Sequence, residues 1–343
     1  MVVGARLKMA RKMAGMSQQE LGERTGVTRM AISKYERDRI TPDSAVLIKL
    51  SQSLDVKVEY LLRPIEVILA EPAFRKRVTL RVKEQEALIE RTRDWVERYL
   101  DIESLFGEQP EFLWPEIDLH IETLDDIERV ALDLRHAWEL GLDPIDNLME
   151  TLEARDIKVH LIEGVDKFDA LTIWIDQTLP VIVVKGDIPG DRQRFNLAHE
   201  LGHILLDIGE NVHAEKAANR FAGAFLVPAP AAYEELGEHR QSVSMQELHL
   251  LKHKYGLSMQ AWVYRAKDLG IISESKSRQL YIQFRQQGWH RNEPGDTYPP
   301  ESPKRMQQLV LRAMAEGVIS STRAEELLDA PLEPLATARR VRG

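Results

Sequence analysis

The sequence predicts a multidomain protein with an all-α bundle at the N-terminus, a helical linker, an α+β domain and a helical C-terminal region. Three observations predict this organisation. The chain has 343 residues, which is long for one hydrophobic core. The first residues contain short helices with clear capping signals, whereas two β-rich runs followed by two amphipathic helices occupy the middle. We place the four parts at residues 1–63, 64–119, 120–240 and 241–343.

The composition excludes several classes of protein. Hydrophobic residues make up 43% of the chain and charged residues 29%, which is ordinary for a soluble globular protein. No apolar stretch approaches the roughly 20 residues of a membrane span, and the first residues lack the pattern of a secretion signal. The sequence therefore predicts a cytoplasmic protein that makes no membrane contact. Cysteine is absent, so disulfides and thiolate metal sites are excluded, and His, Asp and Glu are the strong metal ligands left.

The N-terminal part differs from the remainder in charge. Residues 1–63 contain twelve Lys/Arg and seven Asp/Glu, a charge of +5, and the remainder carries −14. A basic module on an acidic chain indicates an anionic partner, although charge alone also fits the ordinary solvation of a small domain.

Within the basic segment, the caps define two short helices joined by a tight turn. Ser17 with Glu20 three residues later forms a capping box, Gly26 follows the first helix, and Thr28 is a second N-cap. Ala31, Ile32 and Tyr35 form the expected packing face of the second helix. This layout is that of a helix-turn-helix, in which the second helix enters the major groove of DNA.

Residues 6–62, including "ISKYERD", resemble the XRE family of phage-repressor-type DNA-binding domains. The resemblance implies a five-helix bundle that binds a double-stranded operator as a homodimer. It implies DNA contacts at Gln18, Thr28, Arg29, Met30, Ser33 and Lys34, with Arg37 and Arg39 suited to phosphates. Met30 cannot hydrogen-bond a base, so its contact would be apolar, as with a thymine methyl group. The alternative is a bundle used only for protein contact.

The chain between this segment and residue 190 predicts helices and then a sheet. Residues 74–107 have helical apolar spacing over more than thirty residues, which favours a spacer or dimer helix. Pro110 and Pro115 interrupt it, and a second helix is expected over residues 124–141. Residues 146–163 predict a helix that leads into a strand. The β-rich runs at 170–176 and 179–187 are expected to form a hairpin.

Helical periodicity then returns in "DRQRFNLAHELGHILLD" and "EKAANRFAGAFLVP". His199 and His203 lie one turn apart on a helix, so both imidazoles can bind one ion, and Glu200 is placed to act as a general acid/base. Alone, this pattern is only moderately specific. The metzincin continuation is excluded, because Leu206 and Gly209 stand where that pattern needs glycine and histidine.

A catalytic zinc site needs a third protein ligand and an open fourth position. Glu215 begins the next predicted helix and completes a His2Glu set, and Asn219 one turn later is suited to hydrogen-bond a ligand histidine. Asp207, Glu210 and His213 are rival ligands. The alternative is that the two histidines are ordinary core residues. Burying these polar side chains without partners would cost free energy of folding.

Residues 145–235, with "AHELGH" followed by "EKAANRFAGAFLVP", closely resemble the ImmA/IrrE family of metallopeptidases. The resemblance implies a thermolysin-like (gluzincin-type) α+β fold with His199, His203 and Glu215 as metal ligands and Glu200 as the catalytic acid/base. Zinc is the expected metal, and manganese is the alternative. Tyr233, His239 and Arg240 are candidates for stabilising an oxyanion.

Together these features predict a bacterial or phage-type transcriptional regulator with a zinc-dependent endopeptidase domain. Its substrate would be a regulatory protein, either a partner repressor or the chain itself. The alternative is a non-catalytic DNA-binding repressor or antitoxin whose metal site is structural or sensory. We expect the C-terminal region to be a helical support that packs on the peptidase domain.

Overall fold

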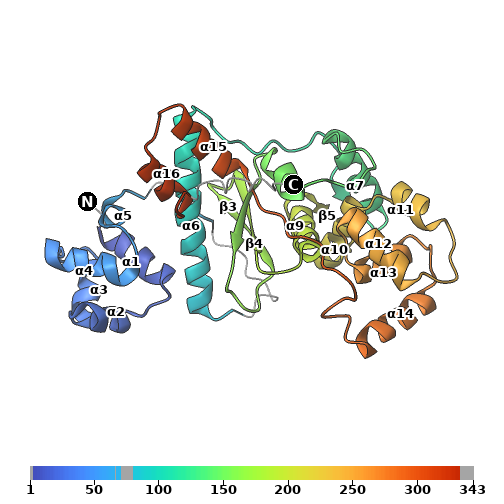
Figure 1. Cartoon of the computed structure of the whole chain (residues 1–343), viewed down its shortest axis with the longest axis horizontal. Helices are drawn as coiled ribbons and strands as arrows, with labels where there is room; N and C mark the ends of the chain where they lie inside the picture. Colours follow the sequence, from blue (N-terminus) through green and yellow to red (C-terminus); the bar gives the residue numbers. More distant parts are fainter. Residues whose placement is uncertain (1–2, 66, 71–79, 333–343) are drawn as a thin grey trace, which may run out of the picture. The chain divides into compact units, whose positions relative to one another are not determined.

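The computed structural model describes residues 3–65, 67–70 and 80–332 and divides into two compact units. The first unit contains the N-terminal residues to Leu69, residues 80–110 and the C-terminal residues from Lys304. The second contains Ala70 and residues 111–303 (Figure 1). The chain thus leaves the first unit after residue 110 and returns to it at residue 304. Each unit is therefore built from segments that are separated in the sequence.

The N-terminal five-helix bundle is present as predicted. Its helices are α1 (Val3–Met13), α2 (Gln18–Thr25), α3 (Arg29–Glu36), α4 (Ser44–Leu54) and α5 (Val58–Leu62). The Ser17–Glu20 capping box starts α2, Gly26 ends it with a φ of 73°, and the Thr28 side chain caps α3. The buried core consists of Leu7, Ala10, Leu21, Ile32, Leu50, Leu54 and Leu61.

A single long helix, α6 (Val82–Leu105), anchors this bundle. It has 24 residues, fewer than the sequence predicted, and it begins where the backbone N–H of Arg81 donates to Glu84; residues 74–79 of the prediction lie outside the described residues. The Arg6 guanidinium of α1, 1% exposed, donates to both carboxylate oxygens of Glu97 on α6. Arg63 donates to the same carboxylate at 2.7 Å. A buried ion pair therefore joins the bundle to α6.

The last two helices, α15 (Arg305–Ala315) and α16 (Ser321–Leu328), pack on α6 (Figure 1). Their shared core contains Tyr99, Ile102, Met306, Leu309, Val310, Ala313, Ala324 and Leu327. Lys57, before α5, also pairs with Glu326 of α16. The side chain of Ser320 caps α16 by accepting from the backbone N–H of Arg323. The expectation that the C-terminal region packs on the peptidase domain is wrong for these helices, because their apolar side chains share a core with Tyr99 and Ile102 of α6.

The second unit is built around a three-stranded sheet with the order β2-β4-β3. Its strands are β2 (Lys158–Ile162), β3 (Ala170–Ile175) and β4 (Leu179–Lys185). The predicted hairpin is confirmed, since β3 pairs antiparallel with β4 across a turn in which Asp176 and Gln177 have positive φ. The helix α8 (Leu148–Glu153) leads into β2, which runs parallel to β4. In β4 every residue up to Val184 is buried, as expected for a central strand.

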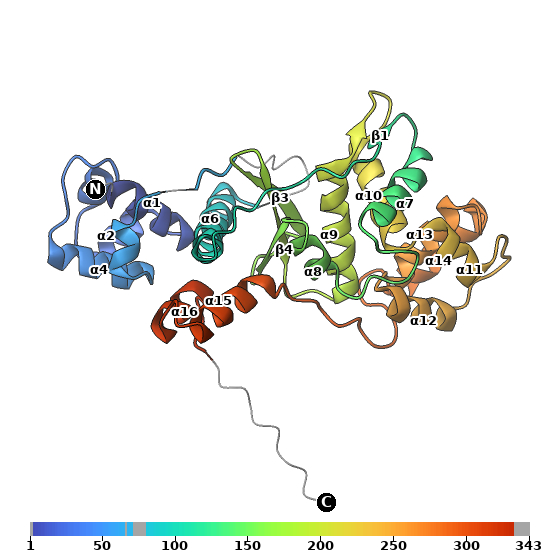
Figure 2. The same cartoon turned by 90° about the horizontal axis from the view of Figure 1, so that it is seen from above.

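The helix α9 (Gly190–Leu205) packs beside this sheet, and α10 (Ala214–Leu226) packs closely on α9 (Figure 2). A Cβ at Gly202 of α9 would lie 3.2 Å from the Cα of Ala218, so glycine permits their close approach. A two-stranded parallel sheet, β1 (His120–Ile121) with β5 (Asp207–Ile208), follows the end of α9. The remaining helices are α7 (Asp126–Ala137), α11 (Ala229–Leu236), α12 (Met245–Tyr255), α13 (Met259–Asp268) and α14 (Glu274–Gln286).

Two buried arginines fix the end of α10. Arg135 of α7, 0% exposed, donates to the carbonyl of Phe225, and Arg265 of α13 donates to the carbonyl of Val227. Arg265 also pairs with both carboxylate oxygens of Glu128. These bonds satisfy the carbonyl groups that a helix leaves without partners at its C-terminus. Among the described residues, no helix is long and apolar enough to cross a membrane.

Candidate metal centre and nucleic-acid interface

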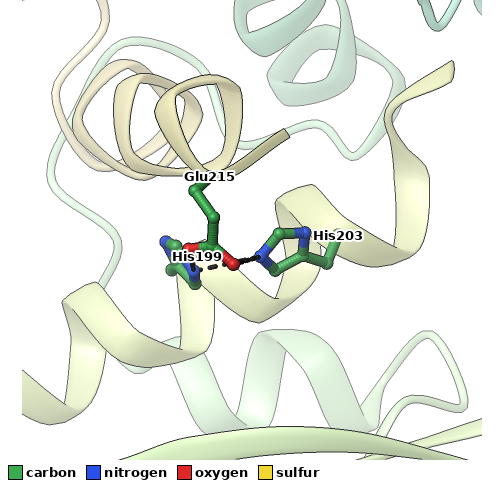
Figure 3. Close-up of side chains that lie close together, drawn as sticks. All are labelled: His199, His203 and Glu215. Atoms are coloured by element: carbon green, nitrogen blue, oxygen red, sulfur yellow. Dashed lines mark hydrogen bonds and ion pairs between the residues drawn. The ribbon is translucent and has the colours of Figure 1, made fainter. Parts of the chain in front are cut away.

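Three side chains from α9 and α10 converge on one point in the second unit (Figure 3). His199 and His203 lie one turn apart on α9, and their Nε2 atoms are 3.1 Å apart. Glu215, in the first turn of α10, places its two carboxylate oxygens 3.6 Å from the Nε2 atoms of His199 and His203. The close packing of α9 on α10 at Gly202 brings the glutamate to the histidines.

The spacing of these atoms fits a tetrahedral metal ion. Ligand bonds of roughly 2.0–2.1 Å place neighbouring ligand atoms of a tetrahedral zinc ion about 3.3 Å apart. The observed separations of 3.1 and 3.6 Å bracket that value. The side chains of His199, His203 and Glu215 are 11%, 28% and 32% exposed, so the centre opens toward solvent on one side. That leaves a route to a fourth position.

The rival metal ligands Asp207, Glu210 and His213 lie outside the group formed by His199, His203 and Glu215. Asp207 accepts a 2.8 Å hydrogen bond from His120, whose other ring nitrogen lies 2.9 Å from Glu122. Hydrogen bonds to the carboxylates of Glu122 and Asp207 raise the pKa of His120, so Asp207 is engaged with this exposed imidazole. His213 is the N-cap residue of α10 and is exposed, as is Glu210.

Glu200 is held by a neighbour that the sequence analysis missed. The hydroxyl of Thr172, in the middle of β3, donates to Oε2 of Glu200 at 2.8 Å. The available signal was a polar residue at the centre of the apolar run "ALTIWI", on the half-buried side of the strand. The Glu200 side chain is thus oriented by a bond from the sheet, while His199 and His203 on the same helix converge with Glu215.

The remaining predicted residues of this region are Asn219 and the three candidates for stabilising an oxyanion. Asn219 lies on α10, one turn after Glu215. Tyr233 donates to the carbonyl of Leu269, and Arg240 donates to the carbonyl of Leu236 and to Glu247, so these two oxyanion candidates are engaged elsewhere. His239 is exposed.

In the first unit, the predicted DNA-contacting residues lie on α3 and at its two ends, with Gln18 at the start of α2. Thr28, Arg29, Met30, Lys34, Arg37 and Arg39 are exposed, and Ser33 is half-buried. Met30 is 69% exposed, an unusual degree for a large apolar side chain on a small bundle.

Gln18 has a fixed orientation. Its Nε2 donates to Glu36 at 2.7 Å, and the same carboxylate pairs with both the Nε and Nη2 atoms of Arg11. The Glu36 side chain is 3% exposed. The amide oxygen of Gln18 is therefore the more available group for an external partner.

Comparison with known proteins finds one family match in each of the two units. Residues 7–61 match the helix-turn-helix family model, and residues 153–267 match the model of the IrrE N-terminal-like domain. The second match covers His199, His203 and Glu215.

Two curated relatives from Bacillus subtilis (strain 168) align with the N-terminal part. The HTH-type transcriptional regulator ImmR is 43% identical over 67 residues, which cover 20% of this chain and 53% of ImmR. The SPbeta prophage-derived uncharacterized HTH-type transcriptional regulator YonR is 42% identical over 60 residues, which cover 18% of this chain and 56% of YonR. The chain thus spans about half the length of these relatives. It joins a helix-turn-helix domain of the XRE type to an IrrE/ImmA-like domain.

Proposed function

We propose that the chain is a DNA-binding transcriptional regulator with a zinc-dependent endopeptidase domain that hydrolyses a peptide bond in a regulatory protein. The observation that carries the proposal is the convergence of His199, His203 and Glu215 beside Glu200, a carboxylate outside the ligand set. The same chain contains a helix-turn-helix domain with an exposed, basic recognition helix. We also infer a thermolysin-like arrangement of the sheet and the two helices.

The three side chains would hold zinc, for which two imidazoles and a carboxylate are suitable donors; manganese is the alternative. When bound there, zinc would supply Lewis acidity for polarising a scissile carbonyl and lowering the pKa of water. Glu200 accepts the proton of the attacking water and delivers it to the leaving amine. Thr172 keeps the Glu200 carboxylate aimed at this task by donating to Oε2.

Two features favour catalysis over a structural metal. A structural zinc site is usually closed by four protein ligands, whereas this group provides three and is partly open to solvent. A structural site also has no need of an oriented general base, yet Glu200 is held by a hydrogen bond from a separate strand.

The helix-turn-helix domain supports binding to a double-stranded operator. Arg29 and Lys34 project from α3, and Arg37 and Arg39 follow its end, where phosphates are contacted in this geometry. We propose that the chain acts as a homodimer on a two-fold operator. We propose that the substrate is a partner repressor or the chain itself, because cleavage of either protein would change the transcription of the genes that the DNA-binding domain controls.

One experiment tests the enzymatic part. Zinc-loaded full-length chain is incubated with a proteome-derived peptide library and, separately, alone, and new termini are mapped by mass spectrometry. The proposal expects cleavage at defined sites by the parent and none by Glu200→Gln, which retains the metal ligands. If the zinc-loaded parent cleaves nothing, or if Glu200→Gln cleaves equally, the endopeptidase proposal is wrong. The chain is then a non-catalytic repressor or antitoxin whose metal site is structural or sensory.

A further inference from the structure

The face of β3 that contacts Glu200 also carries a tryptophan. Side chains alternate along a strand, so Thr172 and Trp174 lie on the same face, while Ile173 and Ile175 lie on the opposite face. Ile173 and Ile175 are buried, whereas Thr172 and Trp174 are only half-buried. The half-buried face of this strand is therefore the one beside the metal centre.

The direction of β3 places Trp174 toward the metal-binding end of α9. Asp169, just before β3, pairs with Arg192 in the first turn of α9, so the strand and the helix start side by side. Further along both elements, Thr172 contacts Glu200. The two elements thus run in the same direction, and the step of roughly 6.6 Å from Thr172 to Trp174 leads from Glu200 toward His203.

A second aromatic residue extends this face. The ring of Trp114 stacks on Trp174, with centroids 6.4 Å apart and planes within 16° of parallel. Phe112 contacts both rings edge-on, at 5.3 Å from Trp114 and 6.3 Å from Trp174. Phe112 is 5% exposed, but Trp114 is 53% exposed and Leu113 is 72% exposed. A buried phenylalanine therefore supports an aromatic surface that remains open to solvent.

The backbone at Trp174 is already engaged. The N–H of Ala70 donates to the carbonyl of Trp174 at 2.8 Å. This carbonyl already has a partner within the chain, so the half-buried ring is the more available group of Trp174. Exposed aromatic surface next to a catalytic centre is typical of a pocket or shelf that takes an apolar side chain.

We propose that Trp174 and Trp114 form a specificity surface for a large apolar side chain, aromatic or branched aliphatic, adjacent to the scissile bond of the substrate. This inference rests on the proposed peptidase function. It defines the substrate class as a peptide whose cleavage site carries such a residue, and it excludes sites flanked only by small or charged residues. The two rings bind the side chain, while Glu200 and the metal ligands act on the peptide bond.

The test uses calorimetric titration of the zinc-loaded full chain with two small metal-binding probes, phenylalanine hydroxamate and glycine hydroxamate. Burial of the benzyl group on the aromatic surface should make the first probe bind roughly tenfold more tightly. Trp114→Ala should reduce this preference to less than about threefold. Because Trp114 is half-exposed, the variant is expected to fold, which thermal unfolding verifies.

Leu250→Ala is the matched control, because Leu250 is 70% exposed on α12 and should leave both affinities unchanged. If the parent binds the two hydroxamates equally, or Trp114→Ala keeps the full preference, the specificity surface is overturned while the metal centre stands. If neither probe binds to protein that contains zinc, the open catalytic centre fails, and this inference fails with it.

Discussion

The hydroxyl of Thr172 and the carboxylate of Glu200 are joined by a 2.8 Å hydrogen bond between β3 and α9, the helix that carries His199 and His203. Helical geometry places Glu200 next to a ligand, yet a glutamate side chain on a helix has several accessible rotamers. The bond from the strand selects one of them. Position on the helix and orientation from the sheet are therefore separate contributions to the same site.

Replacing Thr172 with valine removes this bond and keeps the shape of the side chain. We expect Thr172→Val to bind zinc as the parent does but to lower kcat roughly tenfold on the best peptide from the library, because Glu200 loses its orientation. Thr172→Ser should restore most of the rate. Equal rates for the valine variant and the parent would show that Thr172 has no positioning role.

Met30 should impose a preference for thymine in the operator. Duplexes selected from random sequence by the parent are expected to contain a thymine whose 5-methyl group meets Met30. Replacing that thymine with uracil removes one methyl group, which should weaken binding about fourfold, or about 0.8 kcal/mol. Met30→Ala should not distinguish the two bases in a fluorescence anisotropy titration. If uracil can replace thymine at every position of the selected operators without weakening binding, the assignment of Met30 is wrong.

The capping box of α2 makes the bundle sensitive to acid. The backbone N–H and hydroxyl of Ser17, with Lys83, lower the pKa of Glu20 from 4.5 to about 2. Because the folded pKa lies below the unfolded value, this stabilisation is fully present above pH 4.5 and is lost as the pH falls toward 2. Glu20→Gln should therefore accelerate hydrogen exchange in residues 18–25 at pH 7, with a difference that shrinks below pH 4.5. A constant difference across this range would disagree with the assignment.

Arg135 should be essential for the stability of the second unit. Its guanidinium donates to the carbonyls of Phe225, Gly141 and Asp143, and all three would lose their donor in Arg135→Met. We expect a loss of about 3 kcal/mol in the free energy of unfolding. Arg129→Met on the same helix is the control, because its side chain is 41% exposed, and urea unfolding compares the two. Similar small losses in both variants would contradict the role given to Arg135.

Local signals in the sequence predicted the elements that depend on neighbouring residues. The Ser17 capping box, the Thr28 cap and the hairpin between β3 and β4 are confirmed, since each depends on residues a few positions apart. The convergence of His199 and His203 follows from helical spacing alone. Glu215 was identified from its place at the start of the next helix.

Contacts between distant residues could not be predicted in the same way. The Thr172–Glu200 bond joins residues 28 positions apart, and it depends on how the sheet packs against α9. The packing of α15 and α16 on α6 depends on apolar faces that are more than 200 residues apart in the sequence. The hydrogen bond from Arg98 to the Leu327 carbonyl spans a similar separation. No local pattern encodes such pairings, because each helix is amphipathic and could cover several surfaces.

The most direct test of the proposed catalytic centre is the zinc content of four purified full-length proteins, measured by elemental analysis after the same zinc loading and dialysis. The parent and Glu200→Gln should each retain close to one zinc per chain, because all three proposed ligands are present in both proteins. His199→Ala and Glu215→Ala should lose it. A parent that retains no zinc, or variants that retain as much as the parent, would contradict the His2Glu metal centre.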